Sequence, residues 1–126
     1  MVMALTVTTA TRAEDVNSAN YLLPGCKEWL ARTIDPNSFR RGLCVGTVET
    51  IAFMAQIADL PFAEVERPLY KARCADIPKG VTNDQSVQVV IRYIEARPNR
   101  MHEPFRILAL EGIVDAWPCR GGTNSR

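Results

Sequence analysis

Apolar residues recur every three or four positions along most of the chain, which places them on one side of an α-helix. The clearest case runs from 39 to 58, where the apolar positions are Phe39, Leu43, Cys44, Val48, Ile51, Ala52 and Ala55. This segment is predicted to be an amphipathic helix with one buried face. It also contains Gly42 and Gly46. Glycine costs up to about 1 kcal/mol in a helix interior, so the pair indicates either close approach by another helix or simple tolerance.

A first helix is predicted over residues 16–32. Its apolar positions follow the same helical spacing and are Tyr21, Leu22, Cys26, Trp29 and Leu30. Ser18 or Asn17 can cap its start by accepting a hydrogen bond from a free backbone N–H. Pro24 and Gly25 interrupt the pattern. Because proline removes a backbone donor, we expect a kink or a break into two short helices there.

Two more helices are predicted in the second half of the chain. Thr82 and Gln85 match a capping box, which is typical of a helix start. The β-branched run that follows allows a strand, but the capping box and the polar spacing favour a helix that ends before Pro98. Pro104 suits the first turn of a fourth helix. The apolar positions of these two segments are Val87, Val90, Ile91 and Ile94, then Phe105, Leu108, Ala109, Gly112, Ile113 and Ala116.

The long connection over residues 59–81 carries a further apolar pattern, from which we predict a short helix between Pro61 and Lys71. The expected fold is therefore all-α: a small bundle of four main helices, cross-linked by disulfides, with a short helix in a long connector. A length of 126 residues fits one domain, which we place at 16–120, followed by a flexible tail over 121–126.

The charge composition limits the classes of molecule that this protein is expected to bind. Fifteen basic residues balance 14 acidic ones, for a formal net charge of +1. This balance gives no electrostatic reason to expect nucleic acid or an anionic membrane as a partner. No apolar run approaches the length that spans a bilayer. Residues 1–15 are small and mildly apolar up to Ala13, with Thr11 and Ala13 at the −3 and −1 positions of a plausible signal-peptidase site. They are interpreted as a signal-peptide remnant or, alternatively, as a disordered extension.

The four cysteines are widely spaced and even in number, which favours two disulfides and an oxidising compartment over four buried thiols. If the long helices run up and down, Cys44 comes within reach of Cys74. The last two helices then return Cys119 to the level of Cys26. The predicted pairs are Cys44–Cys74 and Cys26–Cys119.

Catalytic patterns are scarce. The chain has one histidine, His102, and no nucleophile-elbow, phosphate-loop, dinucleotide-binding or zinc-protease motif. We therefore predict no enzyme, no cofactor and no metal site, with His102 and Glu49 as ordinary exposed or paired residues. Arginines and glutamates interleave around residue 100, which is typical of a solvated, mutually paired helix face. Alternatively, they form the rim of a protein-binding loop, with Arg97, Asn99, Arg100, His102 and Glu103 as candidate contacts.

Several short patterns together resemble the Rap/Tai family of small exported bacterial proteins. They are Leu43-Cys44-Val45-Gly46, Cys74 before Ile77-Pro78, Gln85 leading into residues 87–94, and a closing Trp117-Pro118-Cys119. Known members are helical, periplasmic and often dimeric immunity proteins of type VI secretion, which cover the active site of peptidoglycan amidase effectors. Their fold resembles that of the acid-stress chaperone HdeA.

The resemblance implies an exported periplasmic binding protein that inhibits a cell-wall amidase, without nucleic acid or membrane partners and with a homodimer as one expected assembly. The alternative is an HdeA-like periplasmic chaperone, or a relative with another role. A chaperone of this type would expose apolar surface when its carboxylates are protonated in acid. Candidate binding loops for the inhibitor are residues 98–103 and 59–78.

Overall fold

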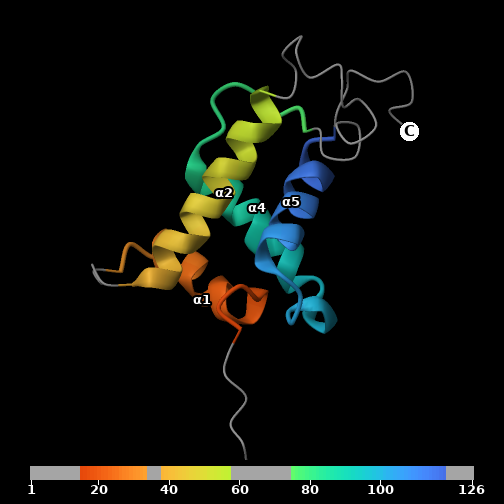
Figure 1. Cartoon of the computed structure of the whole chain (residues 1–126). Coiled ribbons are helices and arrows are strands. Elements are labelled where there is room, and N and C mark those ends of the chain that lie inside the picture. Colours follow the sequence, from red (N-terminus) through yellow and green to blue (C-terminus); the bar gives the residue numbers. More distant parts are fainter. Residues whose placement is uncertain (1–14, 34–37, 58–74, 119–126) are drawn as a thin grey trace, which may run out of the picture.

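The computed structural model describes residues 15–33, 38–57 and 75–118. Four α-helices and one short 3₁₀-helix lie within them: α1 (Ala19–Leu30), α2 (Phe39–Ile57), α4 (Asn83–Glu95), η2 (Pro98–Arg100) and α5 (Phe105–Ala116). The described part of the chain has no strand beyond two isolated β-bridges. Figure 1 shows α2 and α5 running in similar directions, with α4 crossing them at an angle and α1 across one end. Every pair of these four helices is in contact, so the all-α prediction is confirmed.

Helix α1 is shorter than the predicted range of 16–32, but its predicted cap at Ser18 is confirmed. The Ser18 hydroxyl accepts a hydrogen bond from the Tyr21 backbone N–H at 3.3 Å. The expected break at Pro24 does not occur, because one helix continues from Ala19 to Leu30 with Pro24 inside it. The lost backbone hydrogen bond is offset by tertiary packing, since α1 contacts all three other α-helices.

Helix α2 matches its predicted range to within one residue. The Ser38 hydroxyl accepts from the Arg41 backbone N–H at 3.3 Å and so caps its first turn. Its buried face carries Cys44, Val48 and Ala55. Among the described residues, no atom other than the backbone of α2 itself lies within 4 Å of where a Cβ would stand on Gly42 or Gly46. These two glycines therefore do not serve helix packing inside the domain.

Close helix packing uses two other glycines. A Cβ on Gly25 of α1 would lie 2.4 Å from the Arg40 backbone carbonyl carbon and oxygen. A Cβ on Gly112 of α5 would lie 2.9 Å from the Tyr93 Cβ on α4. Only a residue without a side chain allows α1 to approach the first turn of α2 this closely.

Helix α4 has the predicted capping box. The Thr82 hydroxyl accepts from the Gln85 N–H at 3.2 Å, and the Gln85 side chain accepts from the Thr82 N–H at 2.8 Å. The segment is a helix, so the strand alternative is wrong. The predicted apolar positions of α4 and α5 fill the centre of the domain, except Ala116, which is exposed at the end of α5. Phe105 and Ile94 are the largest fully buried side chains there.

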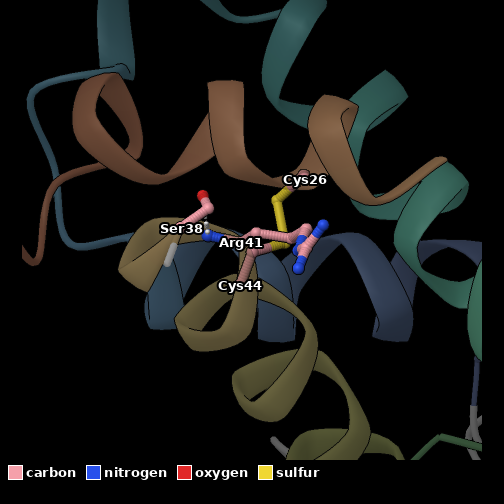
Figure 2. The surroundings of a disulfide bond; sticks show 4 residues. All are labelled: Cys26, Ser38, Arg41 and Cys44. Atoms are coloured by element: carbon pink, nitrogen blue, oxygen red, sulfur yellow. Dashed lines mark hydrogen bonds between the residues drawn. A yellow bond between two sulfur atoms is a disulfide. The ribbon is translucent and has the colours of Figure 1, made fainter. Parts of the chain in front are cut away.

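The disulfide in the described residues joins Cys26 to Cys44, with their Cα atoms 5.5 Å apart (Figure 2). The predicted pairs Cys44–Cys74 and Cys26–Cys119 are therefore both wrong. Helix α1 lies across the end of the domain where α2 begins, and the short sequence between them brings the end of α1 close to the start of α2. Cys26 lies about one turn before the end of α1 and Cys44 about one turn into α2. Both side chains are fully buried.

Several predictions lie outside the described residues. They are the signal-peptide interpretation of the chain before Asp15, the helix between Pro61 and Lys71, the tail over 121–126, and the partners of Cys74 and Cys119. Where the described chain resumes at Ala75, it contacts the residues that follow α5. Ala75 forms an antiparallel β-bridge with Pro118, and the Asp76 N–H donates to the Trp117 carbonyl at 3.0 Å.

Candidate functional site

The connector between α4 and α5, residues 97–104, brings together all five residues predicted to contact a partner. It forms the single turn η2 and then leads into α5. Backbone hydrogen bonds close its two successive turns. The Arg100 N–H donates to the Arg97 carbonyl at 3.0 Å, and the Glu103 N–H donates to the Arg100 carbonyl at 2.9 Å. The connector is thus a regular, hydrogen-bonded element.

The start of α1 attaches to this connector. The Ala19 N–H donates to the Glu103 carbonyl at 3.0 Å, and the Asn20 N–H donates to the Met101 carbonyl at 2.8 Å. The Phe105 N–H donates in turn to the Asn17 carbonyl at 2.7 Å. The first amides of a helix have no partner inside the helix, so the connector supplies acceptors that α1 would otherwise lack. This exchange fixes the connector against the helix core.

Arg100 is the centre of a polar group that we call the Arg100 cluster: Tyr93, Arg100, Glu103 and Glu111. Its guanidinium donates to both carboxylate oxygens of Glu103, at 2.9 and 2.7 Å. It also donates to both oxygens of Glu111, at 2.7 and 3.1 Å. The Tyr93 hydroxyl donates to Glu111 at 2.8 Å. Two-oxygen contacts of this kind hold an arginine in one orientation.

Electrostatics within the Arg100 cluster follow from this geometry. The hydrogen bonds from Arg100 hold the pKa values of Glu103 and Glu111 below the ordinary range of a glutamate, against the opposing effect of burial. The same bonds raise the pKa of Arg100. Burial, followed by the hydrogen bond to Glu111, raises the pKa of Tyr93. The cluster is thus charged and paired at neutral pH.

Arg97 has a separate partner on α4. Its guanidinium carbon lies 3.6 Å from the centre of the Tyr93 ring, a cation–π contact. Its Nη1 donates to the Tyr93 carbonyl at 2.9 Å. Arg97, Arg100 and Glu103 are half-buried, whereas Asn99 and His102 are exposed. The five predicted residues therefore divide into three that shape the connector and two that face solvent.

The sequence predicted that arginines pair with glutamates around residue 100, but Tyr93 was not among the predicted site residues. Tyr93 could have been recognised from its position beside the apolar residues of α4, because a tyrosine hydroxyl there needs a hydrogen-bond partner. Glu49, predicted to be ordinary, is exposed on α2. Within residues 15–33, 38–57 and 75–118 no group of three or more His, Cys, Asp or Glu side chains could hold a metal ion.

A family model described as Rap1a immunity proteins matches residues 18–119. The chain belongs to the Rap1a immunity protein family. The match runs from the N-cap of α1 to just beyond the β-bridge at Pro118, so it includes every described helix and the connector. Membership in the Rap1a family implies a protein effector as partner. Comparison with curated proteins and with solved structures found no match. No helix in the described ranges has the length and hydrophobicity needed to cross a membrane.

Proposed function

We propose that this Rap1a-family protein is a periplasmic immunity protein of type VI secretion that inhibits a peptidoglycan amidase effector by covering its active site. Family membership supports the immunity role. The buried Cys26–Cys44 disulfide supports an oxidising compartment, because such bonds form and persist outside the reducing cytosol.

The proposed contact surface is the connector. We choose it because hydrogen bonds hold it in one conformation. Two backbone hydrogen bonds tie it to α1, and the Arg100 cluster ties it to α5. An inhibitor that covers an active site gains affinity when its loop is ordered before binding, since less conformational entropy is lost on association. The connector meets this condition while leaving Asn99 and His102 exposed.

The five candidate residues take different roles in this proposal. Asn99 and His102 contact the amidase directly, through an amide and an imidazole that can each donate or accept hydrogen bonds. Arg100 acts as a positioning residue, because its donor groups face Glu103 and Glu111 within the protein. Arg97 holds the other end of the connector on Tyr93.

Calorimetry and an inhibition assay test the proposal together. The titrant is a cell-wall amidase effector encoded beside the protein, and the assay follows cleavage of peptidoglycan fragments by that amidase. We expect nanomolar binding and loss of amidase activity at equimolar inhibitor. Asn99→Ala combined with His102→Ala should weaken binding at least tenfold, about 1.4 kcal/mol, without lowering the unfolding temperature. Gln88→Ala, at an exposed position of α4, is the matched control and should bind like the wild type.

Arg100→Ala separates positioning from direct contact. We expect this variant to lose affinity and also to unfold at lower temperature, because Glu103 and Glu111 lose their shared partner. Absence of binding between the wild-type protein and the amidase would contradict the proposed function. Full affinity in the Asn99→Ala/His102→Ala variant would contradict the choice of the connector.

A further inference from the structure

Two exposed apolar side chains lie next to the connector without belonging to it. Val16 precedes α1 and is 45% exposed, and Ile107 lies in the first turn of α5 and is 43% exposed. The backbone brings their two segments together, because Ser18 and Pro104 form an antiparallel β-bridge. Figure 1 shows the start of α1 beside the connector. Both apolar side chains therefore belong to the same end of the domain as the proposed contact residues.

Most exposed side chains at this end are not acidic or basic. We call residues 15–20 and 97–107 together the α1–connector surface. Its exposed acidic and basic residues are Asp15 and Arg106. Besides Val16 and Ile107, its other exposed positions are Asn17, Asn20, Pro98, Asn99, His102 and Pro104. Amides, prolines and aliphatic side chains thus make up most of what a partner would meet.

The charges of the α1–connector surface are largely engaged within the protein. Glu103 and Glu111 both pair with Arg100, and the Asp15 carboxylate accepts a hydrogen bond from the Asn17 N–H at 3.0 Å. Counting Glu111, three arginines balance three acidic residues, which are Arg97, Arg100 and Arg106 against Asp15, Glu103 and Glu111. This surface therefore has no excess charge with which to attract a charged partner.

We propose that Val16 and Ile107 are apolar anchors of the contact with the amidase, and that the α1–connector surface binds an uncharged region of that enzyme. This inference rests on the proposed function and defines the chemistry of the partner's surface. The centre of a protein interface is depleted in charged side chains, and burial of apolar surface is the main favourable term in association. Asparagine amides add hydrogen bonds that adapt to the partner.

The dependence of binding on salt tests the uncharged contact. Salt screens attraction between exposed charges but has little effect on apolar contacts and neutral hydrogen bonds. The dissociation constant for the amidase is measured by calorimetry at neutral pH between about 50 and about 500 mM NaCl. We expect it to change less than about threefold over this range. Arg106→Gln should keep the wild-type affinity, because Arg106 has no acidic partner on the enzyme.

Replacement of the two apolar side chains tests the anchors. Ile107→Ser should weaken binding about tenfold, and Val16→Ser somewhat less, because less apolar surface is covered on association. Isoleucine and serine have similar helix propensities, so the helix content in far-UV circular dichroism should not change. Phe53→Ser is the matched control. It removes a side chain that is 58% exposed near the C-terminal end of α2, at the opposite end of the domain from the connector (Figure 1), and should bind like the wild type.

The outcomes separate this inference from the proposed function. A wild type that does not bind the amidase contradicts the proposed function itself. If the wild type binds but its affinity falls tenfold or more with salt, the uncharged contact is wrong while the function stands. Full affinity in a Val16→Ser/Ile107→Ser double variant likewise overturns the anchors alone.

Discussion

Replacing Gly25 with alanine tests the closest helix contact in the domain. The added Cβ would lie 2.4 Å from the Arg40 carbonyl carbon and oxygen and 2.7 Å from the Arg41 nitrogen. Carbon atoms in favourable contact are about 3.5–4.0 Å apart, so α1 and the first turn of α2 would have to separate by more than 1 Å. The atoms in the way belong to the backbone, which cannot rotate aside. The disulfide at the next residue, Cys26, further restricts that separation.

The expected magnitude follows from two opposing effects. Overpacking of this kind costs about 1–3 kcal/mol, and backbone contacts belong near the upper end. Alanine regains up to about 1 kcal/mol of helix propensity. The net loss in free energy of unfolding is therefore about 2 kcal/mol, which corresponds to a decrease of roughly 8 °C in unfolding temperature for a domain of this size.

Gly42→Ala is the matched control. It makes the same chemical change in a neighbouring helix, but no atom of the other described elements lies within 4 Å of the new Cβ. It should therefore raise stability by up to about 1 kcal/mol. Thermal and urea unfolding of oxidised protein, followed by far-UV circular dichroism, would measure both variants. Dilute protein avoids a contribution from self-association. Equal stabilities for Gly25→Ala and Gly42→Ala would refute the close-contact argument.

Two further predictions concern charge and the remaining cysteines. The two glutamates of the Arg100 cluster have lowered pKa values in the folded protein, so their stabilising effect is present above the ordinary glutamate pKa of about 4.3 and is lost as the pH falls through their folded-state values. Unfolding temperatures measured from neutral pH to about pH 2 should fall less steeply for Glu111→Gln than for the wild type, and equal slopes would contradict this. Cys74 and Cys119 lie outside the described residues, but their chain neighbours Ala75 and Pro118 form an antiparallel bridge and Cys26 already pairs with Cys44, so we expect a disulfide between Cys74 and Cys119. Peptide mapping without reduction should recover that linked pair, and free thiols at both positions would exclude it.

Local signals in the sequence predicted most of the helices correctly. The capping box at Thr82 and the serine before α1 are interactions between residues three apart, and periodicity alone gave the range of α2. The break at Pro24 was wrong because the cost of one backbone hydrogen bond is smaller than the packing of α1 on three neighbours. Sequence patterns over a few residues do not show how much packing a helix gains from distant helices, so they could not predict that α1 continues through Pro24.

Contacts between distant residues were harder to predict. The pairing of Cys26 with Cys44 depends on how closely α1 approaches α2, and this depends on Gly25. The glycines that stood out in the sequence, Gly42 and Gly46, proved to face outward. For the candidate site, arginine–glutamate pairing was predictable from spacing, whereas the second partner of Arg100 was not. Glu111 reaches it only because α5 folds back along α4.

The attachment of α1 to the connector has a consequence for the order of folding. The amides of Ala19 and Asn20 find their acceptors at Glu103 and Met101, which are synthesised more than eighty residues later. A chain interrupted before residue 100 would leave those amides without their native partners and the apolar side of α1 uncovered by α5. Native structure at the start of α1 therefore forms only after the connector has been synthesised. Such long-range closure favours cooperative folding of the four helices together over stepwise folding from α1 onward.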